Sequence, residues 1–250
     1  MLKLFTKKII EKTLGIDRPL LAGASNDSSR EAWVKNALAS IPEGSLLLDA
    51  GAGELRYKKH CSHLKYTSQD FAQYNGSGDC RGLQTESWDQ TKLDIVSDIC
   101  AIPRPDAHFD AILCVEVFEH LPEPCMAIKE FARLLKSGGR LILTAPFASL
   151  THFAPYHYYS GFNRYFFEKH LAASGFKIIK MEQNGNYFEY MAQEALRLPE
   201  VAAKYSDYRL KYFDYCMLKI FIKLMGKISC KDKSSAELLC HGFHVLAEKN

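Results

Sequence analysis

Several features are scarce or missing in this 250-residue chain. No apolar run approaches the roughly 18 residues that a membrane-spanning helix requires. The eight cysteines include no C-x-x-C pair and no metal-like grouping with histidines, so the sequence predicts neither a disulfide framework nor a metal site. The formal net charge is only +3, which gives no electrostatic signal for nucleic acid.

The rest of the composition is that of an ordinary globular protein. Hydrophobic residues make up 47% of the chain and charged residues 24%, with neither repeats nor low-complexity segments. Several cysteines lie in apolar runs, where a reduced thiol packs as a small hydrophobe, and this favours a reducing cytoplasm. Residues 1–27 form a basic segment whose dispersed lysines do not fit a signal peptide.

Predicted strands and helices alternate along most of the chain. After a helix over 28–41, helical spacing and a C-terminal glycine predict another helix over 123–139. Apolar runs predict seven strands, at 45–51, 66–71, 93–99, 109–117, 139–146, 177–183 and 241–249. This order predicts an α/β fold, a Rossmann-like seven-stranded and mostly parallel sheet with helices on both faces.

The first predicted strand ends in an unusual turn, within the stretch LLLDAGAGELRY. Asp49 is followed by Gly51 and Gly53, at the strand end where open α/β sheets bind their ligands. A dinucleotide site would need a third small residue at the position that Arg56 occupies. Acids on both sides of the turn suit a cationic cofactor without phosphates, such as S-adenosylmethionine, better than a diphosphate.

Four spaced motifs carry a family resemblance. They are D-A-G-A-G at 49–53, an acid at Asp70, the S-D-I containing Asp98, and C-V-E-V-F-E-H-L-P-E-P from Cys114. Together they resemble the class I S-adenosylmethionine-dependent methyltransferases, of the type 11 kind, over roughly residues 28–183. The resemblance implies one methyltransferase domain over 28–250.

The resemblance also implies roles for individual residues. Asp70 would accept the ribose hydroxyls, Asp98 would receive the adenine amino group, Phe71 and Ile99 would flank the ring, and the Gly51 backbone would approach the methionine portion. The implied cofactor-binding residues are Asp49, Gly51, Gly53, Asp70, Phe71, Asp98, Ile99 and Glu116. Structural alternatives stay open, because glycines make tight turns and acids form Asx bonds or cap loops.

Histidines after the fourth and fifth predicted strands are the candidates for catalysis. Methyl transfer requires a nucleophile held in line with the methyl carbon, and a hydroxyl acceptor gains from a general base. We take His157 as the first candidate base, with His152 and His120 behind it, although each could serve only as a hydrogen-bonded loop residue. The aromatic residues around His152 and His157 predict a wall for the acceptor.

An insertion before the last predicted strand, at about 185–235, is dense in Tyr, Phe and Lys and is predicted to be helical. Lys219, Lys223 and Lys227 form a narrow stripe on an otherwise apolar helix. That apolar face could pack on the domain, form a homodimer contact or lie on a membrane surface.

The motifs also restrict the acceptor. The D/N-P-P-Y/F motif of enzymes that methylate base amines is missing after the fourth predicted strand, which disfavours nucleic acid. The sequence thus predicts a cytoplasmic methyltransferase acting on oxygen or nitrogen of a small molecule, such as a sugar or a lipid-linked metabolite. Two alternatives stay open, an RNA methyltransferase and a non-catalytic module that binds S-adenosylmethionine.

Overall fold

The chain divides into two compact units. The computed structural model describes residues 22–250; residues 30–183 with 242–250 form a sheet-containing unit, and residues 184–241 with 22–29 form a helical unit. Most of the basic segment predicted over 1–27 therefore lies outside the described residues.

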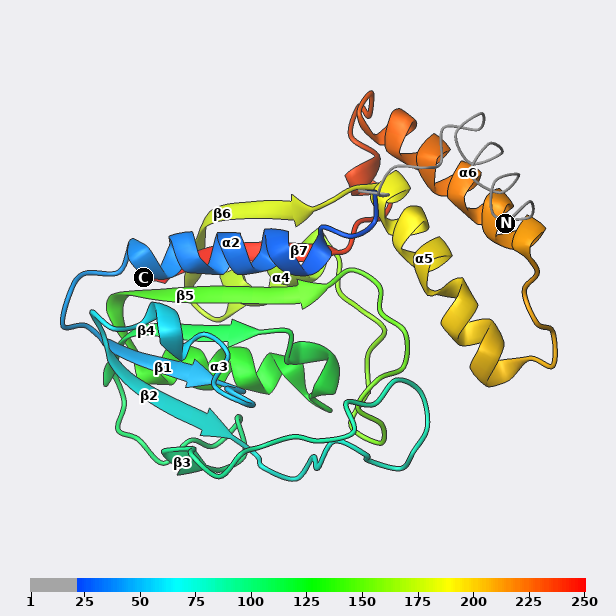
Figure 1. Cartoon of the computed structure of the whole chain (residues 1–250). Coiled ribbons are helices and arrows are strands. Elements are labelled where there is room, and N and C mark those ends of the chain that lie inside the picture. Colours follow the sequence, from blue (N-terminus) through cyan, green and yellow to red (C-terminus); the bar gives the residue numbers. More distant parts are fainter. Residues whose placement is uncertain (1–21) are drawn as a thin grey trace. The chain divides into compact units, whose positions relative to one another are not determined.

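The described residues form a seven-stranded sheet in the order β3-β2-β1-β4-β5-β7-β6 (Figure 1). Strands β1 to β5 pair in parallel, and β7 runs antiparallel to β5. This confirms the predicted seven-stranded, mostly parallel sheet. The strands are β1 (Leu46–Ala50), β2 (Lys65–Asp70), β3 (Ile95–Val96), β4 (Phe109–Val115), β5 (Leu135–Pro146), β6 (Phe176–Asn184) and β7 (Gly242–Lys249).

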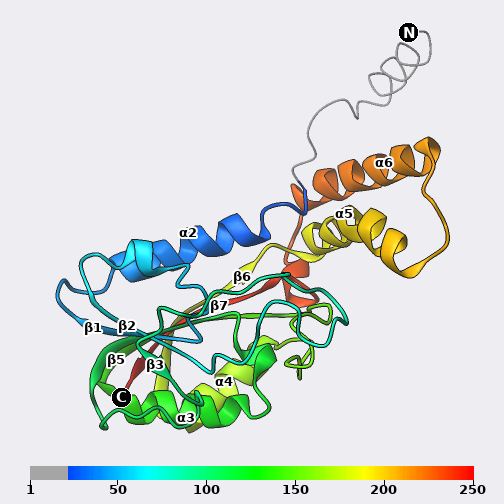
Figure 2. The same ribbon diagram turned by 60° about the horizontal axis from the view of Figure 1, so that its bottom comes forward.

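Helices cover both faces of this sheet, as predicted. Figure 2 shows α2 on one face and α3 and α4 on the other. Val34 and Leu38 of α2 are fully buried in a cluster with Leu47 of β1, and Phe167 of α4 contacts Phe243 of β7 from the opposite side, with 5.9 Å between ring centroids. The helices are α2 (Asn26–Ala39), α3 (Pro124–Leu134) and α4 (Arg164–Ala173), with single 3₁₀ turns η1 (Lys58–His60) and η2 (Phe118–His120).

The strand order places a switch point at β1. Its neighbours are β2 on one side and β4 on the other, both parallel to it, so the chain proceeds outward from β1 in opposite directions. Connections that diverge in this way leave a crevice beyond the carboxyl ends of the strands. The turn after Asp49 opens at this crevice.

Two predicted boundaries are wrong. The helix predicted over 123–139 ends at Leu134, because Leu135 adopts an extended conformation and pairs with Phe109 as the start of β5. Leu135 is fully buried in this strand. Gly138, which lies in the predicted helix, is instead part of β5 and has a φ of +74°. The strand predicted over 93–99 is reduced to Ile95–Val96, which pairs only with the last two residues of β2 at the edge of the sheet.

The helical unit contains the helices predicted for the insertion. They are α5 (Tyr187–Tyr205) and α6 (Tyr212–Ser229), followed by a 3₁₀ turn, η3 (Ser235–Glu237). The Asn186 side chain accepts the Glu189 N–H and so caps α5, while Ala192 of α5 packs against Ile222 and Met225 of α6. Within residues 22–250, the structure contains no helix with both the length and the hydropathy needed to cross a membrane.

Candidate functional site

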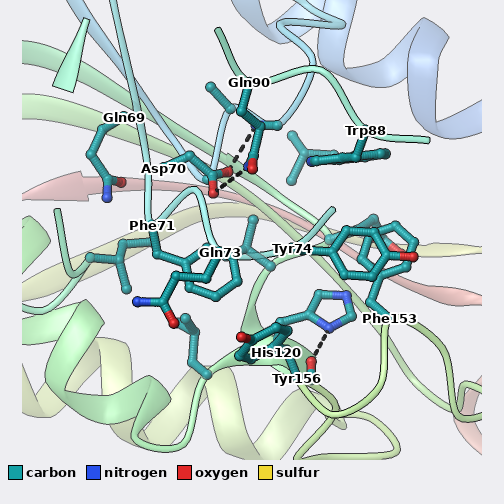
Figure 3. A pocket seen from close by; sticks show the side chains of 18 of the residues that line it. Gln69, Asp70, Phe71, Gln73, Tyr74, Trp88, Gln90, His120, Phe153 and Tyr156 are labelled. Atoms are coloured by element: carbon teal, nitrogen blue, oxygen red, sulfur yellow. Dashed lines mark hydrogen bonds between the residues drawn. The ribbon is translucent and has the colours of Figure 1, made fainter. Parts of the chain in front are cut away.

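A cavity of about 1000 Å³ lies at the carboxyl ends of β1, β2 and β4. Figure 3 shows side chains from the end of β2, from the segment that follows it, and from the loops after β4 and β5 lining this cavity. The structure places every predicted cofactor-binding residue in its wall, namely Asp49, Gly51, Gly53, Asp70, Phe71, Asp98, Ile99 and Glu116. Residues far apart in the sequence therefore face a common space.

The turn after β1 requires its glycines. Gly51 and Gly53 have φ angles of +79° and +51°, a region that other residues rarely adopt. A Cβ atom on Gly51 would lie 2.4 Å from Cγ2 of Val117, and one on Gly53 would lie 2.7 Å from Cζ2 of Trp88. The backbone of this turn is therefore held against the cavity wall with no room for a side chain.

Asp70, at the end of β2, has a fixed carboxylate. It is only 7% exposed, and its Oδ2 accepts the backbone N–H of Gly53 at 2.9 Å. Its Oδ1 accepts the Ala72 N–H at 3.1 Å and the Gln90 side-chain amide at 2.9 Å (Figure 3). Because three donors set its position, Asp70 offers an oriented acceptor at the cavity edge.

Asp49 is an almost completely buried acid, 2% exposed. Burial raises its pKa to about 7; the charge of Asp70 acts in the same direction, and a 2.6 Å hydrogen bond donated by the Tyr66 hydroxyl opposes the rise. Its charge is thus poised near neutral pH. A cation bound close by would favour the ionised carboxylate.

A second group of predicted residues lines another part of the cavity. The Phe71 ring meets Tyr156 edge to face, with 5.0 Å between centroids, and Ile99 is buried. Asp98 also accepts the Cys100 N–H at 2.8 Å, so it forms the Asx turn of the structural alternative as well as lining the cavity.

Glu116 follows β4 in a conformation unusual for its residue type. Its φ of +52° is left-handed, and the side chain is held by the Thr144 hydroxyl at 2.7 Å and by Arg30 of α2 at 3.3 Å. Backbone strain that neighbouring contacts enforce is a feature of functional sites. Arg30 also lines the cavity, and nothing in the sequence motifs pointed to it.

An aromatic wall, formed by Tyr74, Trp88, Phe153 and His120, lines part of the cavity. Phe153 belongs to the wall that the sequence predicts around His152 and His157, whereas Tyr74 and Trp88 were not predicted. Tyr74 and Trp88 come from residues 71–94, a long segment without a helix between β2 and β3. Phe153, after β5, stacks on Tyr74 with 4.5 Å between centroids and on His120 with 5.1 Å. For Tyr74 and Trp88 the only sequence signal was the presence of aromatic residues in a loop, which is weak.

Backbone hydrogen bonds tie the two loops of this wall together. Leu83 donates to the Thr151 carbonyl and accepts from the Phe153 N–H, each at 3.0 Å, and Asp79 donates to the Ala154 carbonyl at the same distance. The loop after β5 is therefore anchored to the segment after β2. This anchoring gives the wall a defined position.

The candidate catalytic histidines lie beside this wall. His120 and His152 line the cavity, whereas His157 does not and lies next to His152, with 4.9 Å between ring centroids. Burial and the neighbouring His152 lower the pKa of His120 to about 3, and burial together with His152 also lowers the pKa of His157. Both rings are thus neutral at physiological pH.

Comparisons with known proteins agree with this architecture. Residues 48–143 match the profile of the methyltransferase domain family. A ubiquinone biosynthesis O-methyltransferase from Xanthomonas oryzae pv. oryzae is 32% identical over 104 residues, which is 40% of this chain and 43% of that protein. A human protein named probable tRNA methyltransferase 9B is 30% identical over 123 residues, which is 47% of this chain and 25% of that protein.

The chain spans less than half the length of either relative. Among solved structures, a S-adenosylmethionine-dependent methyltransferase from Archaeoglobus fulgidus superimposes with a TM-score of 0.54 at 14% identity, covering 89% of this chain and 94% of that one. At this identity the likeness concerns the fold.

Proposed function

We propose that this chain, which carries a class I S-adenosylmethionine-dependent methyltransferase domain, methylates an oxygen or nitrogen atom of a small molecule. The supporting observation is the cavity itself. Its wall includes the acidic ends of β1 and β2, suited to the donor, and a histidine and aromatic region suited to an acceptor.

The charges of the cavity fit this cofactor. Among the described residues, its wall contains five carboxylates, Asp49, Glu54, Asp70, Asp98 and Glu116, but two arginines, Arg30 and Arg56. A sulfonium is attracted by such a surface, whereas a diphosphate is repelled. Asp70 would hold the ribose, the Gly51 backbone would lie along the methionine portion, and Phe71 and Ile99 would enclose the adenine.

Bound S-adenosylmethionine supplies a methyl group already activated by positive sulfur. The protein's task is then to position the acceptor, which can contribute on the order of 7–11 kcal/mol in favourable cases. The aromatic wall would hold an apolar or ring-shaped acceptor, and a neutral imidazole would take up the proton that a hydroxyl acceptor loses. His152 and His120 are the better placed for this step, since they line the cavity, and His157 would act through them.

An RNA acceptor is the second candidate, because a human relative carries the name of a tRNA methyltransferase. The carboxylates of the cavity wall disfavour an RNA acceptor, since RNA binding depends on cationic surfaces and counterion release. An RNA enzyme would bind RNA with an affinity that falls steeply as salt rises.

A methyl-transfer screen tests the proposal. Purified chain and radiolabelled S-adenosylmethionine are incubated with a small-molecule extract and, separately, with total RNA. We expect label in the small-molecule fraction, with transfer slowed about 100-fold or more in His152→Gln. Label in RNA alone would favour the second candidate, and cofactor binding without transfer to either fraction would favour a non-catalytic module.

The helical unit could add a surface contact. Phe213 and Met217 of α6 are 70% and 51% exposed, which is unusual for such side chains. A homodimer contact or a peripheral membrane contact, as the sequence predicts, would cover them. Analytical ultracentrifugation and co-sedimentation with anionic vesicles distinguish the two.

A further inference from the structure

Three histidines, one of which belongs to the aromatic wall, lie next to one another. His120 belongs to η2, while His152 and His157 belong to the loop after β5. One ring nitrogen from each lies within 4.8 Å of the others. Separations of 32 and 5 residues conceal this cluster in the sequence.

Backbone carbonyls orient two of the rings. Nδ1 of His120 lies 2.6 Å from the Tyr156 carbonyl oxygen (Figure 3), and Nδ1 of His152 lies 2.8 Å from that of Leu150. Because a carbonyl oxygen only accepts, Nδ1 carries the proton in each neutral ring and Nε2 carries the lone pair. Metal-binding histidines are typically fixed in this manner, through the nitrogen that does not bind the ion.

A buried carboxylate faces both Nε2 atoms. Glu119 is 1% exposed, and its Oε1 lies 3.8 Å from Nε2 of His120 and 3.8 Å from Nε2 of His152. That distance is too long for a hydrogen bond, and Oε2 of Glu119 is buried without a hydrogen-bond partner among the described residues.

His157 completes the arrangement. Both of its ring nitrogens are buried, and neither has a hydrogen-bond partner in the part of the chain that the structure describes. Buried polar atoms without partners are rare in folded proteins, and an ion is one of their recognised explanations. Three imidazoles and a carboxylate thus meet at a point where several polar atoms lack partners.

We propose that His120, His152 and His157 bind one divalent transition-metal ion, for which Zn²⁺ is the probe of choice, with Glu119 beside it as the balancing negative charge. Three imidazoles with an open fourth position are the donor set of many catalytic zinc sites. Nitrogen ligands of tetrahedral zinc lie about 3.4 Å apart, so small side-chain rotations would close the cluster around an ion. Mg²⁺ and Ca²⁺ prefer oxygen ligands and fit this set poorly.

This inference rests on the proposed function only for the use of the ion. His120 and His152 line the cavity, so the ion would lie at its acceptor side. With the ion bound, the histidines are its ligands and no longer proton acceptors, and an acceptor hydroxyl that coordinates this Lewis acid releases its proton to water instead. The carbon–sulfur bond of the donor then breaks as the carbon–oxygen bond forms, and its electron pair stays on sulfur.

Metal binding can be measured on the apoprotein without an acceptor. The purified full chain, treated with a chelator, is titrated with Zn²⁺, and the loaded protein is studied by X-ray absorption. We expect one ion per chain at micromolar concentration or below, with imidazole nitrogens and no sulfur in its shell. Sulfur ligands would assign the ion to cysteines and overturn the proposal, as would the absence of binding.

Two variants locate the site. His157→Gln removes one ligand and should weaken Zn²⁺ binding by at least about tenfold. His108→Gln is the matched control, because His108 directly precedes β4, at the end of that strand remote from the cavity. Circular dichroism checks that both fold, and equal affinities for the two folded variants would refute the site.

A separate titration with S-adenosylmethionine distinguishes the two proposals. If the metal-free chain binds S-adenosylmethionine but not Zn²⁺, the metal site is wrong and the proposed function stands. If it binds Zn²⁺ but not S-adenosylmethionine, the metal site stands and the proposed function fails.

Discussion

Oδ2 of Asp70 accepts a hydrogen bond from the backbone N–H of Gly53 at 2.9 Å. This bond connects the end of β2 directly to the turn after β1, so the two groups assigned to opposite parts of one cofactor are fixed relative to each other. Gln90, from the segment without a helix, holds the other oxygen at 2.9 Å. Hydrogen bonds within the protein thus fix the part of the cavity assigned to the methyl donor.

Replacing Asp70 should weaken cofactor binding. Asp70→Ala removes the acceptor for the ribose and also releases the Gly53 N–H, so we expect the Kd for S-adenosylmethionine to rise about 10- to 100-fold. Asp110→Asn is the control, since Asp110 pairs with Lys136 near the start of β4, away from the cavity. Isothermal titration measures both, and an unchanged Kd for Asp70→Ala would remove the ribose role.

Gly51 should be irreplaceable for steric reasons beyond its backbone angle. Gly44 has nearly the same φ, +78°, but an added Cβ there meets nothing within 4 Å. Gly44→Ala should therefore lower the free energy of unfolding by about 1–2 kcal/mol through backbone strain alone. Gly51→Ala should cost more, because of Val117, and adding Val117→Ala should restore part of the difference.

Denaturant unfolding measures this series. Equal losses in the free energy of unfolding for Gly44→Ala and Gly51→Ala would mean that the Val117 side chain moves aside without destabilising the protein. The tight contact between the turn and Val117 would then have no energetic consequence.

Asp49 should make the protein less stable as pH rises. Its pKa is raised from 3.8 to about 7 by burial, so its contribution to stability is fully present below about pH 4 and is lost as pH rises toward 7. The free energy of unfolding should fall by on the order of 4 kcal/mol over this pH range. Relative to wild type, Asp49→Asn should gain stability across this range.

Asp110→Asn is the control, because the pKa of Asp110 is shifted in the opposite direction from that of Asp49. Although burial raises the pKa of Asp110, the Lys136 ammonium and the Leu46 N–H hold it below the ordinary value. The stabilisation that Asp110 provides is lost only as pH falls below about 4, so Asp110→Asn should be less stable than wild type by a nearly constant amount between pH 4 and 8. Unfolding curves from pH 4 to 8 would contradict this account if the two variants behaved alike.

The rate of methyl transfer should not fall as pH drops through 6.5, where an ordinary histidine base becomes protonated. Burial and His152 lower the pKa of His120 to about 3, so its neutral form persists well below neutral pH. Single-turnover rates between pH 5 and 8, with saturating cofactor, test this for an acceptor identified by the screen. An acidic limb near pH 6.5 would exclude a ring buried as His120 is from the role of base.

Sequence reasoning succeeded where local pattern determines structure. The buried run 46–50 and its glycines predicted the first strand and its turn, and acids at strand ends predicted Asp70 and Asp98 near one cavity. Parallel sheets make such inferences reliable, because their strands end at a common edge.

Sequence reasoning failed where tertiary contacts decide. Leu135 lies in a pattern typical of a helix but belongs to a strand, because pairing with Phe109 buries its side chain. The grouping of Tyr74 with Phe153, and of His120 with His157, depends on the loop after β5, which meets the loops after β2 and β4 through backbone hydrogen bonds. No spacing rule within one segment predicts such a meeting.

The central claim is that the glycine turn and its acids receive a cationic sulfonium cofactor. Isothermal titration of the purified chain with S-adenosylmethionine, and in parallel with a nicotinamide dinucleotide, tests it most directly. The account predicts one S-adenosylmethionine bound per chain and no measurable binding of the dinucleotide. Binding of the dinucleotide alone would contradict it.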